Sequence, residues 1–283
     1  MRQGRKQTFI HNYKEYQELL KLPLGAKIER AENLILDALR NYKKTMVACS
    51  WGKDSIVLLH LIRNFCPNIL VVYHNTGVEY PQNLAYRDRM LKEWNISNYV
   101  ETMPKSTFFK LVEEYGYPKP RQMGTGKGGK VKSRGKSRSP KCCRVLKEEP
   151  AKLFHKENQI DCEFVGLQAS ESMVRRLSFL REGEAFDSVS YKCRIVRPIM
   201  IWNDKDIWQY QKECGIPRNT LYDLMPRNGC MPCTGFKNWK AIMAKANPKL
   251  YDIVSKRVGE PQLKCFGVWD QPSPFISEKM NQK

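Results

Sequence analysis

The sequence lacks any apolar stretch long enough to cross a bilayer, and no apolar signal region follows its basic start at residues 1–6. These absences argue against a membrane protein and against secretion, so we expect a soluble, cytoplasmic protein with no membrane partner. An internal repeat is also missing. In such a protein the ten cysteines are better explained as thiols, metal ligands or catalytic groups than as disulfides.

Acidic residues are missing from one long segment. From Lys119 to Lys147 there are eleven Lys or Arg residues and no Asp or Glu, which supplies more than half of the formal charge of +20. Residues 124–139 are rich in glycine and serine without apolar periodicity, so we expect a mobile loop. A nucleic acid or nucleotide phosphates would explain the charge, and a solvated surface loop is the alternative. The candidate nucleic-acid contacts are Lys127, Lys130, Lys132, Arg134, Lys136 and Arg138.

A short polar turn, Ser50 to Ser55, separates an apolar run at 45–49 from a densely apolar helical pattern that begins at Ile56. The free N–H groups of a helix start, a glycine, two serine hydroxyls and Lys53 together suit a pyrophosphate. A Walker A loop is excluded, because that loop needs GxxxxGK[ST] and Asp54 follows Lys53 here. The turn therefore predicts a phosphate-binding loop, with an ordinary strand-to-helix turn as the alternative.

Strand-like and helix-like segments alternate along the chain, which predicts an α/β fold with a doubly wound, mainly parallel sheet. We expect a helical lead-in at 1–44, a nucleotide-binding α/β domain at 45–235 with a basic mobile loop at 119–141, and a helical region and tail at 236–283. The expected strands are 45–49, 69–74, 99–101, 162–165 and 195–199. The expected helices are 13–20, 28–39, 84–94, 106–115, 145–157, 205–214 and 239–258.

Four of the cysteines form two close pairs, Cys142-Cys143 and Cys230-Met231-Pro232-Cys233. Four thiolates supplied in this way can hold a [4Fe-4S] cluster or a tetrahedral zinc ion. We favour the cluster, because adjacent cysteine side chains diverge and the corners of a cluster can accept both. Buried packing is expected for most of the other cysteines.

Six segments, in the order SWGKDS, YHNTGVEYP, CCRVLKEEP, GLQASESMVRR, RPIMIW and GCMPCT, resemble the phosphoadenosine phosphosulfate (PAPS) reductase family of the PP-loop ATP pyrophosphatase superfamily. The resemblance implies an adenine nucleotide alpha hydrolase-like sheet with the nucleotide over the strand ends, and one [4Fe-4S] cluster on the four paired cysteines. The implied nucleotide-binding residues are Ser50, Trp51, Gly52, Lys53, Asp54, Ser55, Thr76, Gly77, Glu79, Ser170, Glu171, Arg175 and Arg176.

The sequence departs from the family at two places. The family loop usually reads SGGKDS, and Trp51 replaces its first glycine; since tryptophan lacks the backbone freedom of glycine, we expect a differently shaped loop. Assimilatory reductases of the family end in a Glu-Cys-Gly-Leu-His segment with the attacking cysteine, and that segment is absent. Cys265, in a Lys-Cys-Phe-Gly setting, is the remaining C-terminal candidate for a catalytic thiol.

The superfamily also contains ATP pyrophosphatases that adenylate a substrate oxygen and let sulfur displace AMP, among them tRNA thiolation enzymes and the iron–sulfur enzymes of DNA phosphorothioation. In that chemistry Lys53 and the helix start stabilise the departing pyrophosphate, and Mg²⁺ bridges the phosphates through Asp54. The basic segment runs directly into Cys142, so we expect such an enzyme, with ATP, a DNA or tRNA substrate and a cysteine desulfurase as sulfur donor.

Two other functions stay open. One is a PAPS or adenosine 5'-phosphosulfate reductase that forms sulfite with thioredoxin. The other is a non-catalytic iron–sulfur protein that binds nucleic acid, which the retained Lys53 and Asp54 argue against. The oligomeric state is open as well, a homodimer included.

Overall fold

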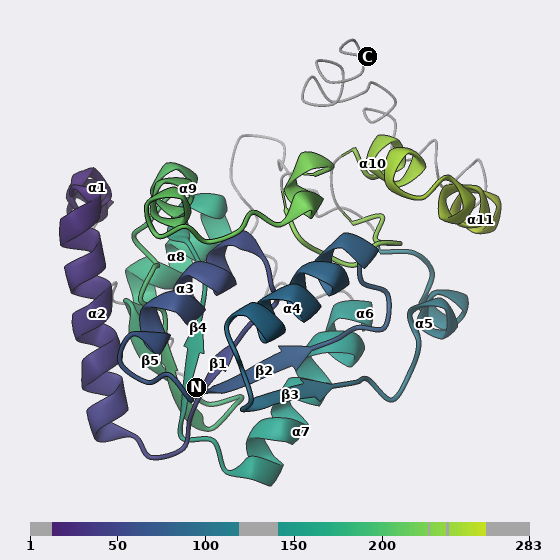
Figure 1. Cartoon of the computed structure of the whole chain (residues 1–283). Helices are drawn as coiled ribbons and strands as arrows, with labels where there is room; N and C mark the ends of the chain where they lie inside the picture. The colour runs from purple at the N-terminus through teal and green to yellow at the C-terminus, as the bar shows by residue number, and fades with distance from the viewer. Residues whose placement is uncertain (1–12, 119–140, 226, 236–237, 259–283) are drawn as a thin grey trace, which may run out of the picture. The chain divides into compact units, whose positions relative to one another are not determined.

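The computed structural model describes residues 13–118, 141–225, 227–235 and 238–258 (Figure 1). The candidate nucleic-acid contacts at 127–138 and Cys265 lie outside these residues, so their roles stay predictions. Within the described ranges, no helix is both long enough and apolar enough to cross a membrane.

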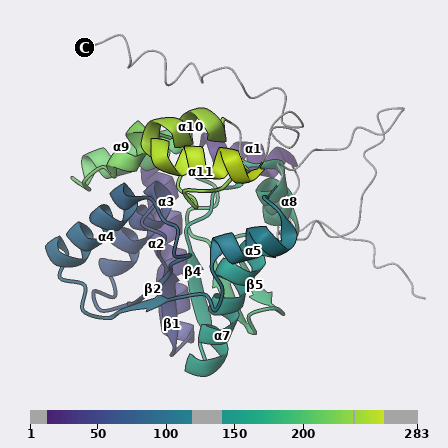
Figure 2. The ribbon, with the colours of Figure 1, turned by 90° about the vertical axis from the view of Figure 1, so that its right-hand side faces the viewer.

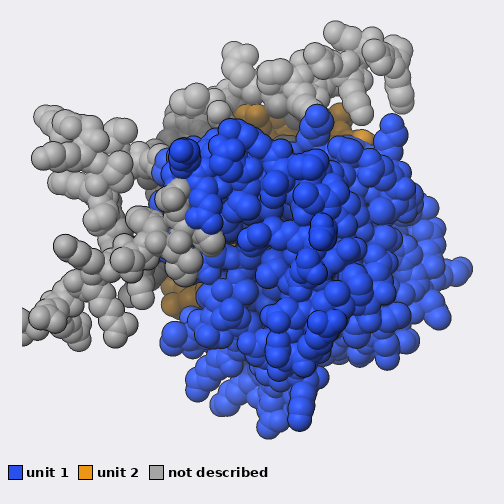
Figure 3. All heavy atoms as spheres, turned by 90° about the vertical axis from the view of Figure 1, so that its left-hand side faces the viewer, with its two compact units in different colours: residues 1–74, 85–102, 151–219 blue, residues 75–84, 103–150, 220–283 orange. Residues whose placement is uncertain are grey.

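The chain folds into two compact units whose segments alternate along the sequence (Figure 3). Unit 1 comprises Met1–His74, Ala85–Thr102 and Ala151–Asn219, and unit 2 comprises Asn75–Leu84, Met103–Pro150 and Thr220–Lys283. The domain boundaries expected after residues 44 and 235 stay predictions.

Unit 1 is built on a six-stranded sheet with the order β3-β2-β1-β4-β6-β5. The strands are β1 (Thr45–Ala48), β2 (Leu70–His74), β3 (Tyr99–Thr102), β4 (Cys162–Val165), β5 (Ala185–Ser188) and β6 (Cys193–Val196). All neighbouring strands are parallel except β5, which pairs antiparallel with β6 at the edge. The predicted doubly wound, mainly parallel sheet is confirmed. β5 was not predicted, because its four residues, Ala-Phe-Asp-Ser, form no apolar run, and none of them is buried.

Helices cover both faces of this sheet. Figure 2 shows α2, α3 and α4 on one side and α7 on the other. On the α7 side, Phe154 and Ile160 pack with Met46 of β1 and Val72 of β2. The helices wholly or mostly in unit 1 are α1 (Tyr13–Lys21), α2 (Leu24–Asn41), α3 (Lys53–Arg63), α4 (Pro81–Glu93), α7 (Glu149–Asn158), α8 (Met173–Glu182) and α9 (Asp204–Glu213).

The described part of unit 2 is helical. Its elements are α5 (Phe108–Tyr115), α6 (Lys141–Cys143), a π-helix (Arg144–Glu148), a 3₁₀ turn (Thr220–Asp223), α10 (Trp239–Ala246) and α11 (Pro248–Val258). Phe108, Leu111, Leu146, Trp239 and Met243 belong to one buried apolar cluster that joins these segments. The helix expected at 145–157 therefore starts as a π-helix, a difference that apolar spacing does not reveal.

Candidate functional site

Two loops of unit 1 leave the sheet at the same point. The chain runs from β1 outward to β3 and then places β4 on the other side of β1. β1 and β4 are parallel, with Ala48 beside Val165, so the loops after them start next to each other. A reversal of strand order of this kind marks the ligand crevice of doubly wound sheets.

Gly166 allows the loop after β4 to approach the start of α3. A Cβ atom at position 166 would lie 3.0 Å from the backbone N and Cα of Ser55, which is tighter than nine in ten real Cβ contacts. The Ser55 hydroxyl donates to the Gly52 carbonyl (3.1 Å) and lies 3.3 Å from the Ser50 hydroxyl. Gly52 is the N-cap of α3 and makes no side-chain cap, so two hydroxyls and the helix N-terminus converge on one place.

Trp51 adopts a backbone conformation that the sequence analysis did not expect of tryptophan, and the expectation of a differently shaped loop stays a prediction. Its φ of 61° lies in the left-handed region, so tryptophan does adopt a backbone conformation that glycine favours. The indole is fully buried and lies 6.0 Å from the Tyr99 ring, centroid to centroid. Asn219 donates to the Trp51 carbonyl at 3.0 Å. Burial of the indole and this hydrogen bond offset the cost of the left-handed backbone.

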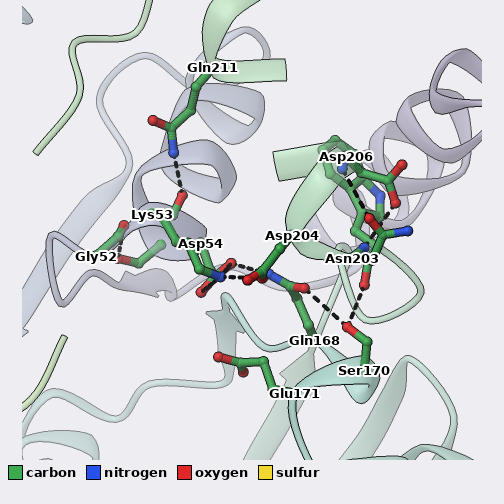
Figure 4. A network of polar contacts seen from close by, with 12 residues as sticks. Gly52, Lys53, Asp54, Gln168, Ser170, Glu171, Asn203, Asp204, Asp206 and Gln211 are labelled. Atoms are coloured by element: carbon green, nitrogen blue, oxygen red, sulfur yellow. Dashed lines mark hydrogen bonds and ion pairs between the residues drawn. The ribbon is translucent and has the colours of Figure 1, made fainter. Parts of the chain in front are cut away.

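Lys53, the first residue of α3, is 4% exposed and is held by two carboxylates (Figure 4). Its Nζ donates to Asp54 Oδ1 at 2.9 Å and to Asp204 Oδ1 at 2.7 Å. Gln168 donates to the same Asp54 oxygen. Burial raises the pKa of Asp54, and Lys53 and Gln168 act against that rise. The arrangement has carboxylate oxygens for a divalent cation and an ammonium group for a phosphate.

Asp204 is placed by the start of α9. Asn203 caps this helix by accepting from the backbone N–H of Lys205 and Asp206, and Asp206 accepts from the backbone N–H of Asn203 in return. From the same helix, Gln211 donates to the Lys53 carbonyl at 3.0 Å. The α9 helix is therefore fixed at both of its ends to Lys53, in the turn that was predicted to bind phosphate.

Of the predicted nucleotide-binding residues between 170 and 176, only one is connected to Lys53 and Asp54. The Ser170 hydroxyl donates to Gln168 Oε1 at 3.2 Å, which connects it to Asp54 through one amide. Glu171 and Arg175 form an ion pair with each other. Arg176 lies over the ring of Tyr16, 5.9 Å from its centroid. The structure therefore joins Ser170 to Lys53 and Asp54 and gives Glu171, Arg175 and Arg176 other contacts.

The four paired cysteines come together within unit 2. Cys142 and Cys143 lie on α6, and Cys230 and Cys233 lie in the turn before α10. All four are half-buried and form no disulfide, and Cys143 is close enough to interact electrostatically with each of the other three. The side chains of Cys142 and Cys143 also form a hydrogen bond with each other. Four thiols gathered in this way can serve as the ligands of one metal centre.

Polar groups of unit 2 surround these thiols. The Cys230 thiol lies 3.5 Å from the Thr76 hydroxyl, which donates to Glu79 at 2.7 Å. The negative charge of Cys230, and then that of Glu79, raises the pKa of Lys147. Burial raises the pKa of Cys230, and it raises that of Cys233 to about 11. Thr76 and Glu79, predicted as nucleotide ligands, are thus placed with the cysteines, and Gly77 shares their turn with φ 76°.

Three polar residues of these sites were not predicted: Gln168, Asp204 and Lys147. Gln168 and Lys147 lie inside segments that carry the family resemblance, and a closer reading of those segments could have included them. Asp204 is 151 residues from Lys53 in the chain, and its exposed position in a polar helix start gives no signal of the contact.

Comparison with known proteins agrees with this geometry. The profile of the phosphoadenosine phosphosulfate reductase domain matches residues 44–236. The chain therefore belongs to the phosphoadenosine phosphosulfate reductase family, as the ordered segments predicted.

Individual relatives are more distant. An adenosine 5'-phosphosulfate reductase from Bacillus cytotoxicus is 27% identical over 202 residues, which cover 70% of this chain and 76% of the relative. One from Bacillus cereus (strain Q1) has the same identity and coverage. Among solved structures, a phosphoadenylyl-sulfate reductase from Candida auris in complex with phosphate is similar with a TM-score of 0.51 and 15% identity, over 77% of this chain and 94% of that one. That likeness supports the fold alone.

Proposed function

We propose that this enzyme of the PAPS reductase family is an ATP pyrophosphatase of sulfur metabolism that adenylates a nucleic acid for sulfur insertion. The observation that carries the proposal is the pair of carboxylates around Lys53, namely Asp54 and Asp204 at 2.9 and 2.7 Å from its Nζ. A nucleotide that loses pyrophosphate needs a cation beside its phosphates, whereas reduction of an activated sulfate releases no pyrophosphate. Two carboxylates and the Gln168 amide carbonyl are ligands that Mg²⁺ accepts.

The residues of the loop have separate tasks in this chemistry. The α3 N-terminus and the hydroxyls of Ser50 and Ser55 bind phosphate oxygens. Lys53 stabilises the charge that develops on the departing pyrophosphate. Asp54 and Asp204 keep the Lys53 ammonium group in position, and bound Mg²⁺ would neutralise the phosphate charge that the single lysine leaves.

The four cysteines fit an iron–sulfur cluster. Their side chains are gathered in one unit and form no disulfide, and the charge of Cys143 acts on each of the other three. Cys142, Cys143, Cys230 and Cys233 would hold the cluster, which would supply sulfide or electrons for the sulfur step. Lys147 places a positive charge beside these thiolates and stabilises their charged form.

A nucleic-acid substrate is supported by the basic sequence between Lys119 and Lys147, and a cysteine desulfurase would supply sulfur as a persulfide. The second candidate is an adenosine 5'-phosphosulfate or PAPS reductase with thioredoxin as electron donor. The names of the curated relatives favour it. In that case Cys265 would attack the sulfonyl sulfur.

Two assays on anaerobically purified, full-length protein separate these candidates. One follows pyrophosphate from ATP and Mg²⁺, with and without DNA or tRNA; the other follows sulfite from adenosine 5'-phosphosulfate or PAPS with reduced thioredoxin. We expect pyrophosphate release that nucleic acid stimulates, lost in Lys53→Gln and kept in Lys205→Gln, a matched change of an exposed lysine. Sulfite release that Cys265→Ser abolishes would instead establish the reductase. Nucleic-acid binding without turnover in either assay would leave a non-catalytic binding protein.

Iron analysis tests the cluster separately. We expect the purified protein to be brown and to contain iron, and Cys230→Ser to lose both. Cys214→Ser, a change of an exposed cysteine, should retain them. Iron-free wild-type protein after anaerobic reconstitution would contradict the cluster.

A further inference from the structure

A second group of potential metal ligands lies in unit 1, and the proposed function does not use it. His155 of α7, Glu163 of β4 and Cys193 of β6 each offer one ligand atom, and these atoms lie within 4.8 Å of one another. The three side chains are 2%, 6% and 6% exposed. Sulfur, imidazole nitrogen and carboxylate oxygen therefore meet in a site that is shielded from water.

The sheet register explains why these residues meet. Glu163 pairs with Ile195 across β4 and β6, and Cys193 lies two residues before Ile195. Since side chains alternate along a strand, Glu163 and Cys193 lie on the same face of the sheet. His155 covers that face from α7, with its ring 4.9 Å from the Tyr191 ring.

One polar contact of this site, between His155 Nε2 and Glu163, is poorly aligned. His155 Nε2 lies 3.1 Å from Glu163 Oε2, yet this buried nitrogen has no partner with hydrogen-bond geometry. His155 Nδ1 lies 3.4 Å from the Cys193 sulfur. A buried carboxylate beside a poorly aligned imidazole is costly, and a cation shared by the two would remove that cost.

We propose that His155, Glu163 and Cys193 bind a single Zn²⁺ ion that fastens α7 to β4 and β6. Zinc accepts all three donor types, whereas Mg²⁺ and Ca²⁺ select oxygen alone. In tetrahedral zinc sites, ligand atoms are roughly 3.3–3.8 Å apart, given bonds of about 2.0–2.3 Å. The three ligand atoms lie within 4.8 Å of one another, so a contraction of at most about 1.5 Å would bring them to this spacing. The group contains no fourth ligand side chain among the described residues, so water completes the shell.

A catalytic cysteine is the competing explanation, since thiol, imidazole and carboxylate also form nucleophilic triads. Reactive cysteines are partly exposed and have a lowered pKa. Cys193 is buried, and burial raises the pKa of its thiol to about 12. The site therefore suits a structural ion better than a nucleophile.

Zinc content tests the proposal in full-length protein in which two of the four paired cysteines have been replaced. Cys142→Ser/Cys143→Ser protein is stripped with chelator under reducing conditions, loaded with ZnCl₂ and desalted, and zinc is measured per chain. We expect about one equivalent, lost when Cys193→Ser or His155→Gln is added and retained when Cys214→Ser is added. Zinc should also raise the thermal midpoint of unfolding of the parent double variant.

X-ray absorption at the zinc edge of the same double variant identifies the atoms bound to zinc. This measurement tests the proposal even if the added substitutions prevent folding. Zinc coordinated by one sulfur atom together with nitrogen and oxygen atoms would support binding by Cys193, His155 and Glu163. Absence of bound zinc, a shell dominated by sulfur, or zinc content unchanged by Cys193→Ser in folded protein would overturn it. Since iron analysis tests the four paired cysteines independently, the two proposals can fail separately.

Discussion

At the scale of single residues, the two carboxylates around Lys53 differ in how much their substitution would cost in stability. Asp54 is largely buried, and its loss would leave the Lys53 ammonium group in a poorly solvated place, which is costly. The Asp204 side chain is 63% exposed and can be changed without such a penalty. Asp204 is therefore the better residue with which to separate function from folding.

Asp204→Asn should lower kcat/KM for pyrophosphate release by about tenfold, less than the 10²–10³ that loss of a direct charge-stabilising group costs. The amide keeps the shape of the side chain and removes the charge that pairs with Lys53 and that would attract Mg²⁺ in the proposed function. The Mg²⁺ concentration at half-maximal rate should rise as well. Asp187→Asn, at an exposed carboxylate on β5, serves as the control. Equal kinetics in both variants would remove Asp204 from the site.

Trp51→Gly should reduce the free energy of unfolding by about 3–5 kcal/mol, the usual cost of removing a buried tryptophan. Relief of the left-handed backbone returns only about 1–2 kcal/mol. Lys192→Gly is the matched control, because Lys192 also has a positive φ, 55°, with an exposed side chain. Urea denaturation should show little loss of stability for that control. A Trp51→Gly protein as stable as wild type would mean that the indole packing contributes little.

At the scale of elements, α3 and α9 are joined by a titratable contact away from the phosphate loop. His60 Nδ1 lies 2.9 Å from the Tyr210 hydroxyl. Burial, and then the charge of Arg63, lowers the pKa of His60 from 6.5. At pH values between the pKa of His60 in the folded protein and its pKa in the unfolded chain, the unfolded chain therefore binds more protons than the folded protein. Stability from neutral His60 is complete above about pH 6.5 and is lost as pH falls towards the folded pKa.

His60→Gln should flatten this acid loss of stability, measured as the urea midpoint between pH 8 and pH 5. Tyr210→Phe removes the hydrogen bond but leaves the buried imidazole, so it should lower stability while keeping the acid slope. The same slope in His60→Gln as in wild type would assign the pH dependence to other groups.

The sequence predicted most elements of the sheet and its helices, because the sheet buries consecutive apolar residues, such as Met46 and Val47 in β1 and Val71 to Tyr73 in β2. It did not predict β5, whose stability comes from pairing with β6 rather than from its own composition. The phosphate loop and the cysteine pairs were recognisable as local patterns. A contact such as that between Lys53 and Asp204 depends on the order of the strands in the sheet. A short sequence pattern carries no information about that order.

At the scale of the whole molecule, net charge rather than fold governs the first encounter with a polyanion. Replacing Lys127–Arg138 with a neutral linker should weaken DNA or tRNA binding and make its dependence on salt shallower, since fewer counterions are released. Pyrophosphate release without nucleic acid should be unchanged. Binding with the same salt slope before and after the replacement would contradict a contact by this segment.

The alternation of the two units along the chain also sets an order of events during synthesis. Cys142 and Cys143 are synthesised before residues 151–219 of unit 1, and Cys230 and Cys233 are synthesised only afterwards. Chains fold progressively from the N-terminal side as they emerge. The first pair of thiols is therefore made before the sheet has its last strand, β6, and the second pair is made after it. If the four cysteines hold the proposed cluster, its assembly has to follow synthesis of the whole sheet, and a chain truncated after residue 219 would lack half of the ligands.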